Sequence, residues 1–249
     1  MTAASDHATD NRLLAALGPD DRGRLAPHLE RVDLEPGAVL FEPGRTLTHA
    51  WFPEGCVVSL ALTTREGRTA EAITVGREGA VGLAEALGSD RALALGVVQV
   101  PGPALRLPLG RLRAALEASP GLRRLCSCQV QALVAGVMQV AVCNALHEAQ
   151  ARLGEWLLVL HDQAGAGGAA ALPVKQEFLA GLLGVQRSTV SAAAVALQDK
   201  GLIRYRRGRV WVLDRAGLEA VSCGCYGLFR AAREVLWGDA PPEPAADVA

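Results

Sequence analysis

The segment between Pro173 and Arg215 concentrates positive charge in an otherwise near-neutral chain of 249 residues. It holds eight basic and three acidic residues, a local charge of +5, whereas the whole chain carries −1. Such a patch is the electrostatic footprint of a polyanionic partner, and arginine can pair bidentately with a guanine edge. These residue types predict contact with duplex DNA. The candidate contact residues are Lys175, Gln186, Arg187, Ser188, Thr189, Ser191, Arg206, Arg207 and Arg209.

The elements that must position these side chains can be predicted from residues 176–195, QEFLAGLLGVQRSTVSAAAV. Leu179, Leu182 and Leu183 lie on one face at helical spacing. Gly184 can adopt the positive φ of a sharp turn between two helices. Val190 gives the second helix an inward face. The segment therefore predicts a helix-turn-helix, whose second helix presents its N-terminal residues to base edges.

A basic hairpin is expected directly after this motif, over residues 201–213. Two short β-rich runs flank a turn at Arg207 and Gly208. A helix-turn-helix followed by such a hairpin is typical of a winged helix. The wing arginines should contact phosphates and provide salt-dependent affinity without sequence choice. The alternatives are a solvated charged turn for the wing and a phosphate contact or solvated charge for Arg187.

The N-terminal half has the pattern of a small all-β domain. Two short helices are expected first, over 11–17 with Asp10 as N-cap and over 20–29. Short β-rich runs then alternate with Gly- and Pro-containing turns, which indicates a sandwich or barrel. The candidate strands are 31–34, 39–41, 49–52, 57–63, 70–75, 93–100 and 104–108.

A long helix is expected to begin at Ser119 and Pro120, after a short helix over 109–118. Its apolar positions alternate at spacings of four and three, which favours a two-fold coiled-coil seam. Packing of this stripe on the domain's own core is the alternative. Further helices are expected over 145–163 and 214–236, with an exposed loop over 164–171. The predicted seam is Cys126, Val130, Leu133, Val137, Val140, Asn144 and His147, with Val134, Met138 and Ala141 facing the barrel.

A barrel, a long helix and a winged helix-turn-helix, in that order, resemble the Crp/Fnr family of bacterial transcription regulators, most specifically over residues 177–214. The resemblance implies an α+β fold: an N-terminal β-roll or jelly-roll barrel, a long dimerisation helix and a C-terminal winged helix-turn-helix. It also implies a homodimer whose recognition helices enter successive major grooves. By resemblance, Arg187, Ser188 and Ser191 fall on base-reading positions. Ser188 stands where relatives often carry Glu, and Ala192 where they often carry Arg, so the usual half-site is not expected.

The family's cyclic-nucleotide cassette is only half present. That cassette is a Gly-Glu pair followed by Arg-Ser/Thr-Ala, in which Glu takes the ribose hydroxyl and Arg the phosphate. Here Gly82 is followed by Leu83, and Arg91 by Ala92 and Leu93. Gly82, Arg91 and Ala92 mark a candidate effector pocket, but the sugar anchor is missing. We therefore expect a sensor with another ligand or none; for Arg91, a surface charge beside Asp90 is the alternative.

The six cysteines are expected to be thiols. Cys126-Ser-Cys128 and Cys223-Gly-Cys225 are spaced too closely for the usual Cys-x-x-Cys pair, and the linear sequence shows no four-ligand pattern. The first cysteine is Cys56, so an N-terminal cluster of ligands is absent. Small buried hydrophobic roles are therefore expected for the thiols. We predict no cofactor: no metal site, no iron–sulfur cluster, and no haem through His147 or His161.

These observations predict a domain order and a cellular setting. Residues 1–9 and 237–249 are expected to be disordered tails, 10–118 a cyclic-nucleotide-binding-like sensor domain, 119–143 a dimerisation helix, and 144–236 the winged helix-turn-helix domain. The N-terminus lacks a signal peptide, and no run approaches the ~20 apolar residues of a membrane span. A cytoplasmic protein without membrane contact is expected.

The predicted function is sequence-specific regulation of transcription rather than catalysis. The five histidines are far apart, and no P-loop, dinucleotide fingerprint or Ser/His/Asp arrangement is visible, so no enzyme is expected. The expected partners are promoter DNA, a second copy of the chain, RNA polymerase and a small-molecule effector. The alternative is a ligand-gated regulator that acts through protein contacts rather than DNA.

Overall fold

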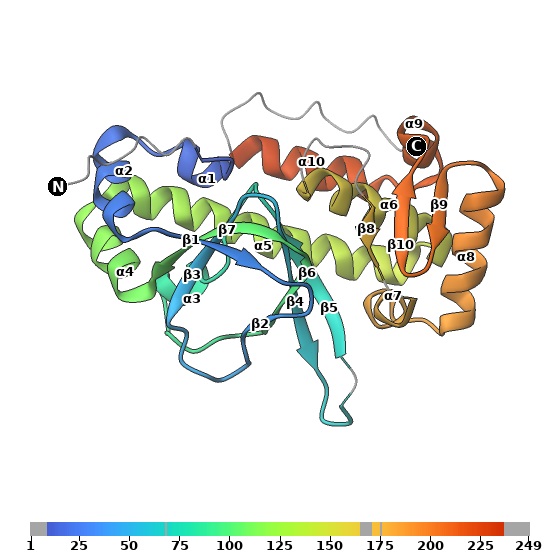
Figure 1. Ribbon diagram of the computed structural model, residues 1–249, viewed down its shortest axis with the longest axis horizontal. Coiled ribbons are helices and arrows are strands. Elements are labelled where there is room, and N and C mark those ends of the chain that lie inside the picture. The colour runs from blue at the N-terminus through green and yellow to red at the C-terminus, as the bar shows by residue number, and fades with distance from the viewer. Residues whose placement is uncertain (1–8, 68, 165–170, 175, 237–249) are drawn as a thin grey trace.

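The computed structural model describes residues 9–67, 69–164, 171–174 and 176–236 (Figure 1). The predictions for the two tails, for most of the loop at 164–171 and for Lys175 lie outside the described residues, apart from Thr9, Ala164 and Ala171. A sheet-rich N-terminal domain, a long helix and a mainly helical C-terminal domain follow one another along the chain. The predicted α+β architecture is confirmed.

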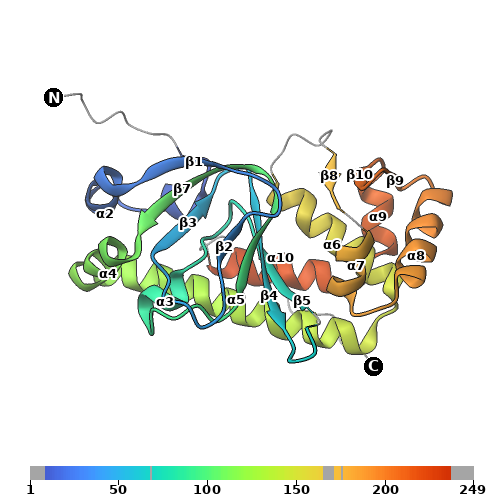
Figure 2. The same cartoon turned by 60° about the horizontal axis from the view of Figure 1, so that its bottom comes forward.

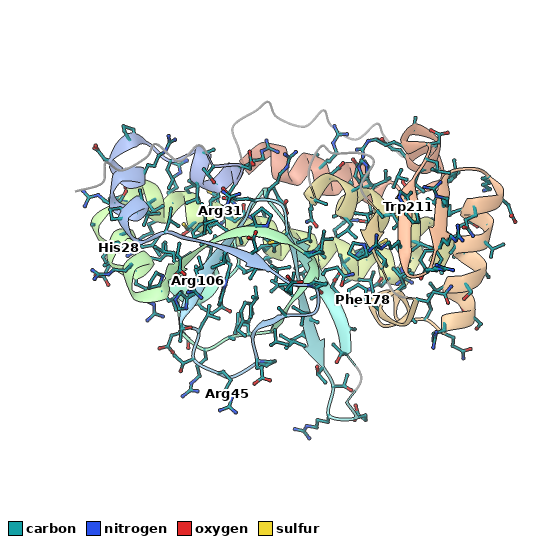
Figure 3. The ribbon with its side chains drawn as sticks, in the orientation of Figure 1. His28, Arg31, Arg45, Arg106, Phe178 and Trp211 are labelled. Carbon is teal, nitrogen blue, oxygen red and sulfur yellow. The ribbon has the colours of Figure 1, made fainter. Side chains whose placement is uncertain are left out.

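Two antiparallel sheets form the N-terminal barrel. One has the strand order β1-β7-β3 and the other β2-β6-β4-β5. Glu30 and Arg106 are register partners on β1 and β7, and the Arg106 guanidinium donates two hydrogen bonds to the Glu30 carboxylate, at 2.9 and 2.8 Å (Figure 3). The predicted strands are confirmed to within two residues. They are β1 (Glu30–Leu34), β2 (Val39–Phe41), β3 (His49–Pro53), β4 (Val57–Thr63), β5 (Thr69–Val75), β6 (Leu95–Val100) and β7 (Gly102–Pro108).

Large side chains fill the space between the two sheets. Phe52 and Leu107 are buried there, and the rings of Phe41 and Trp51 lie 5.7 Å apart between their centroids. A Cβ atom at Gly96 would lie 2.4 Å from the Phe41 ring. Only glycine therefore leaves room for that ring to pack across the sheet.

The N-terminal helices differ from the prediction in their cap. Helix α1 (Arg12–Ala15) is capped by Asn11, not Asp10: the Asn11 side chain accepts from the Leu14 amide at 3.1 Å. The Asn11 amide also donates to the carbonyls of Pro53 and Gly79, at 2.8 Å each. Asn11 is fully buried and holds the N-terminus against the barrel. Helix α2 (Pro19–Leu25) and a 3-10 turn (Ala26–His28) follow.

Helix α5 (Pro120–Leu146) spans most of the molecule and links the barrel to the C-terminal domain (Figures 1 and 2). It follows α4 (Leu109–Ala118), and the Ser119 hydroxyl accepts from the Leu122 amide at 3.1 Å as its N-cap. By length and composition α5 is also apolar enough to cross a membrane. The expectation that no segment resembles a membrane span is therefore wrong, because the glutamines within α5 add no charge and leave its mean hydropathy high.

The N-terminal half of α5 turns its faces the opposite way from the prediction, whereas Val137 of the predicted seam is 39% exposed. The first residues of the predicted seam face inward: Cys126 is buried, and Val130 and Leu133 pack against the barrel core. The side expected to face the barrel is exposed instead, with Val134 at 54% and Met138 at 65%. Both sides of the helix are apolar, so spacing alone could not show which one the barrel covers.

The C-terminal domain begins after a break at His147 and Glu148, which are both extended. Helix α6 (Ala149–Gln163) therefore starts later than predicted, and α5 continues past Cys143. The helix predicted over 214–236 is wrong, because Ser222, Cys223 and Gly224 divide it into α9 (Arg215–Val221) and α10 (Cys225–Leu236). Helix α10 returns along α5 (Figures 1 and 2).

The barrel and the C-terminal domain share an apolar core. Val57 and Ile73 of the sheet cluster with Leu157 of α6. The Trp156 indole donates to the Glu71 carboxylate at 3.0 Å across this boundary. Gln163 of α6 also donates to the Thr74 carbonyl at 3.0 Å. The outer strand β5 therefore contacts the C-terminal domain, together with β4 through Val57 and β6 through the hydrogen bond from Gln99 to the Pro173 carbonyl at 3.1 Å.

Candidate nucleic-acid interface

The helix-turn-helix consists of α7 (Gln176–Leu183) and α8 (Arg187–Asp199). Gly184 has a φ of 62°, and a Cβ added there would meet nothing within 4 Å. The Val185 amide donates to the Ala180 carbonyl at 3.1 Å, and the Gly184 amide to the Gly181 carbonyl at 3.3 Å. This is a Schellman-type end to α7. Gly184 is needed for its left-handed backbone rather than for space.

Helix α8 has one buried and one exposed face. Val190, Ala194 and Leu197 are buried, as the apolar spacing predicts. Gln186, Arg187, Ser188 and Thr189 are all exposed around the N-terminus of the helix. Ser191 differs, because its hydroxyl donates to the Arg187 carbonyl at 3.0 Å and is only partly exposed. In Figure 1, α8 lies at the outer edge of the molecule, away from the barrel.

The end of α8 leads directly into the wing. Gly201 has a φ of 71°, and the Leu202 amide donates to the Leu197 carbonyl at 3.1 Å. The Gln198 side chain then accepts from the Tyr205 amide at 2.8 Å. The hydroxyl of Tyr205 donates to the Val174 carbonyl at 3.1 Å. These bonds fix the wing relative to the recognition helix.

The wing is a three-stranded sheet of β8 (Leu172–Pro173), β9 (Ile203–Arg206) and β10 (Arg209–Val212), in the order β8-β10-β9. Arg207 and Gly208 have φ values of 51° and 71°, the signature of a two-residue type I′ turn. Arg206, Arg207 and Arg209 are exposed around this turn. The Arg204 guanidinium stacks 4.5 Å from the centre of the Trp211 ring (Figure 3). The predicted DNA-contacting residues thus form two groups, at the α8 N-terminus and on the wing.

The comparison with known proteins agrees with this geometry. Residues 151–221 match the model of the Crp-like helix-turn-helix domain. The chain has the Crp/Fnr regulator fold. No curated protein matches the chain. The Crp-like domain therefore includes α6 to α9, together with the wing.

Solved structures resemble the chain over most of its length. FixK2 from Bradyrhizobium japonicum is 14% identical with a TM-score of 0.67, covering 78% of this chain and 98% of that chain. The c-di-GMP-responsive global regulator CLP from Xanthomonas campestris is 19% identical, with a TM-score of 0.61 and coverages of 78% and 99%. A CRP-family transcriptional regulator from Thermus thermophilus is 21% identical, with a TM-score of 0.61 and coverages of 78% and 96%. At these identities the likeness shows the fold alone.

A polar cluster fastens the last helices of the Crp-like region to α6. The Asp162 carboxylate accepts from the Tyr226 hydroxyl at 2.7 Å and pairs with Arg215 at 2.8 Å. Burial alone would raise the pKa of Asp162, but its contacts with His161, Tyr226 and Arg215 lower the pKa to about 2. Asp162 is therefore a carboxylate at neutral pH and holds α9 and α10 in place.

The candidate effector residues face different environments. Gly82 has a φ of 92° ahead of α3 (Leu83–Leu87), and a Cβ there would lie 2.9 Å from Leu47. Arg91 is exposed and donates to the Gly44 carbonyl at 3.0 Å. Ala92 is buried in the barrel core, as is Leu83, which stands at the position of the family's sugar-binding Glu. This arrangement supports the surface-charge interpretation of Arg91.

A cavity between the barrel and the Crp-like domain holds ionisable groups that sequence reasoning missed. It is lined by Glu71 of β5 and by Arg152, Glu155 and Trp156 of α6. Burial raises the pKa of Glu71 to about 7, although the hydrogen bond from the Trp156 indole opposes this shift. Arg152 donates to the Asn144 side chain at 2.5 Å and to the Leu183 carbonyl. The burial of Glu71 could have been predicted from the sequence, because side chains alternate between the two faces of a strand and Glu71 shares a face with the buried Ile73.

Five of the six cysteines fall into two groups, and the sixth, Cys128, is half-buried on α5. Cys56 and Cys126 are buried within apolar surroundings, which raise the pKa of both thiols to about 12, as expected for small hydrophobic roles. Cys143, Cys223 and Cys225 instead meet one another and His147. The fold therefore assembles a group of four potential metal ligands, which the linear sequence did not show. Linear spacing missed it because the ligands come from two distant segments.

Proposed function

We propose that this protein is a homodimeric, sequence-specific DNA-binding transcription regulator of the Crp/Fnr type, located in the cytoplasm. The observation that carries the proposal is the exposed group from Gln186 to Thr189 at the start of α8, within a Crp-like domain and beside a wing with three exposed arginines. The chemistry of this surface is recognition of a nucleic acid, and none of its groups is arranged as a catalytic site.

The two groups of residues have different roles in this proposal. Arg187 at the start of α8 reads a base edge, and a bidentate contact with guanine is worth about 1–3 kcal/mol of discrimination. Gln186, Ser188 and Thr189 contact neighbouring base edges or phosphates. The wing arginines neutralise phosphates and set the register of the domain on the duplex.

A second copy of the chain covers the exposed face of α5. Val134, Val137, Met138, Val142 and Leu146 are 39–74% exposed and recur at helical spacing along one side. An apolar stripe of this kind pairs with the same stripe in a two-fold dimer. Such a dimer would set the two α8 helices for half-sites about one helical turn apart.

The sensor barrel regulates the placement of the Crp-like domain. Strand β5 contacts α6 and α7, and the break at His147 and Glu148 separates α6 from the dimer helix. An effector that favours one arrangement of β5 would shift the population of DNA-binding placements. The effector is a small molecule other than a cyclic nucleotide, because Leu83 is buried where the sugar anchor would stand. RNA polymerase is the proposed downstream partner.

The deciding experiment is fluorescence anisotropy with a duplex from the protein's own promoter and a scrambled duplex, each at two salt concentrations. Arg187→Ala is compared with wild type and with Arg45→Ala, an exposed arginine on the barrel (Figure 3). Arg187→Ala should lose about 5- to 150-fold of the preference for the promoter and keep weak, salt-sensitive binding. Arg45→Ala should match wild type. Sedimentation equilibrium should give twice the chain mass of 26.0 kDa.

The competing function is regulation through protein contacts. It would be favoured if wild type bound neither duplex, both alone and with cell extract supplying effectors. Equal binding of the two duplexes by wild type would remove sequence specificity from the proposal.

A further inference from the structure

Four potential metal ligands meet where α5 ends. Cys143 lies in the last turn of α5, and the amide of His147, the first residue after the helix, donates to the Cys143 carbonyl at 3.1 Å. Cys223 and Cys225 flank Gly224 in the break between α9 and α10. Their three sulfur atoms and a histidine nitrogen all lie within 4.8 Å of one another.

The distances suit a single tetrahedral ion. Sγ of Cys143 lies 3.4 Å from Sγ of Cys223, and Sγ of Cys225 lies 3.5 Å from Nδ1 of His147. A zinc ion bound at about 2.3 Å to sulfur and 2.0–2.1 Å to nitrogen keeps its ligand atoms roughly 3.5–3.8 Å apart. An iron–sulfur cluster would have to place several irons and sulfides among these atoms, which calls for a wider arrangement.

The three cysteines are buried together, apart from the two large apolar cores. Cys143, Cys223 and Cys225 are 3%, 7% and 2% exposed, and they form a cluster of their own, separate from both apolar cores. The Gln139 amide donates to Sγ of Cys225 at 3.0 Å. Cys225 is also the first residue of α10, and a helix N-terminus stabilises a thiolate.

We propose that Cys143, His147, Cys223 and Cys225 bind one Zn²⁺ per chain in a closed tetrahedral site. The three thiols release their protons on binding, so the ion is held by three thiolates and a neutral imidazole. Four protein ligands leave no position for water, which makes the site structural rather than catalytic. Zinc fits three sulfurs and one nitrogen better than magnesium or calcium, which prefer oxygen.

The site spans the junction between the dimer helix and the Crp-like domain. His147 is the first residue after α5, directly before the start of α6, while Cys223 and Cys225 join α9 to α10. A bound ion would therefore tie the last two helices to the end of α5 across the break at residues 147 and 148. Its loss should loosen the placement of the recognition helix and weaken promoter binding.

The test is metal analysis of the full chain purified without chelators under reducing conditions. We expect about one zinc per chain, removable by a chelator. Refilling with Co²⁺ should give the sulfur-to-cobalt charge transfer and strong visible bands of a tetrahedral site. Cys223→Ser and Cys225→Ser should lose most of the metal. Cys128→Ser is the matched control, because Cys128 is a thiol of α5 outside the group, and it should keep one ion.

The conservative variant His147→Cys keeps four ligands and remains informative if the serine variants fail to fold. It should still bind one Co²⁺, with a spectrum shifted towards four-sulfur coordination. The proposal is overturned if wild type contains no zinc and gives no tetrahedral cobalt spectrum. Iron with matching inorganic sulfide, or a Cys143–Cys223 disulfide in the reduced preparation, would overturn it as well. Since these readouts need no DNA, they stand apart from the test of the proposed function.

Discussion

The recognition helix and the sensor cassette are built alike but present their arginines differently. Each begins after a left-handed glycine, Gly184 with a φ of 62° and Gly82 with a φ of 92°. Arg187 is exposed at the start of α8, whereas Arg91 donates to the Gly44 carbonyl on the barrel surface. The exposed start of α8 follows from one helix and the turn before it. An effector site would need groups from several loops to converge.

The two glycines show the same contrast in their surroundings. A Cβ at Gly184 would meet nothing within 4 Å, so only the local backbone conformation requires glycine at that turn. A Cβ at Gly82 would lie 2.9 Å from Leu47 and 3.1 Å from Ala50. The start of the cassette therefore packs closely against the barrel at Gly82, and its conformation depends on that tertiary packing.

The largest expected effect is on the affinity for duplex DNA, when the three exposed arginines of the wing are replaced. The triple variant Arg206→Ala, Arg207→Ala, Arg209→Ala should bind any duplex about 10²–10³-fold more weakly at low salt, with the salt dependence reduced by roughly three units. Removing three exposed charges of the N-terminal domain, Arg24, Arg45 and Arg91, is the matched control and should change neither value. Anisotropy titrations over a salt series measure both. Equal losses in the two variants would mean that overall charge, rather than the wing, supplies the affinity.

A smaller effect is expected from the two turn glycines, measured by urea unfolding. Gly82→Ala should cost about 2–4 kcal/mol, because it combines a strained backbone with a steric clash. Gly184→Ala carries only the backbone cost and should lose about 1 kcal/mol. The opposite order would show that the cassette relaxes more easily than the recognition turn, and would weaken the contrast drawn above.

Features fixed by local chemistry could be predicted from the sequence. Such features depend on the spacing of apolar residues and on glycines that adopt a positive φ. The structure has them where expected, as the strand at 57–63, the helix at 109–118 and the turn at Gly184. The exposed start of α8 follows from the same reasoning, since Val190 and Leu197 fix which face is buried.

Features that depend on contacts between distant segments could not be predicted. Helix α5 is apolar on both sides, so the barrel, not the spacing, decides that Val134 and Met138 are exposed. The break at Gly224 interrupts an otherwise helical pattern, and without it Cys223 and Cys225 would not both reach Cys143. Spacing within one segment carries no information about a ligand set assembled from two.

The smallest expected effect is on the pH dependence of stability, and it comes from Glu71, where β5 of the barrel contacts α6. Burial raises the pKa of this carboxyl from 4.5 to about 7. The folded chain therefore holds a proton that the unfolded chain releases, and stability should fall as the pH rises from about 4.5 to about 7. Glu71→Gln keeps an acceptor for the Trp156 indole but cannot ionise, so its stability should not show this loss.

Urea unfolding at about pH 5 and about pH 8 measures the difference between wild type and Glu71→Gln. The variant should gain roughly 1–2 kcal/mol on wild type between these two pH values. Burial also raises the pKa of Glu155, in the same cavity, but Glu155 is present in both proteins and largely cancels. Glu66→Gln changes an exposed glutamate of the β4–β5 turn and should follow wild type. A constant gap between Glu71→Gln and wild type would mean that Glu71 is charged in the folded protein, with the hydrogen bond from Trp156 compensating for its burial.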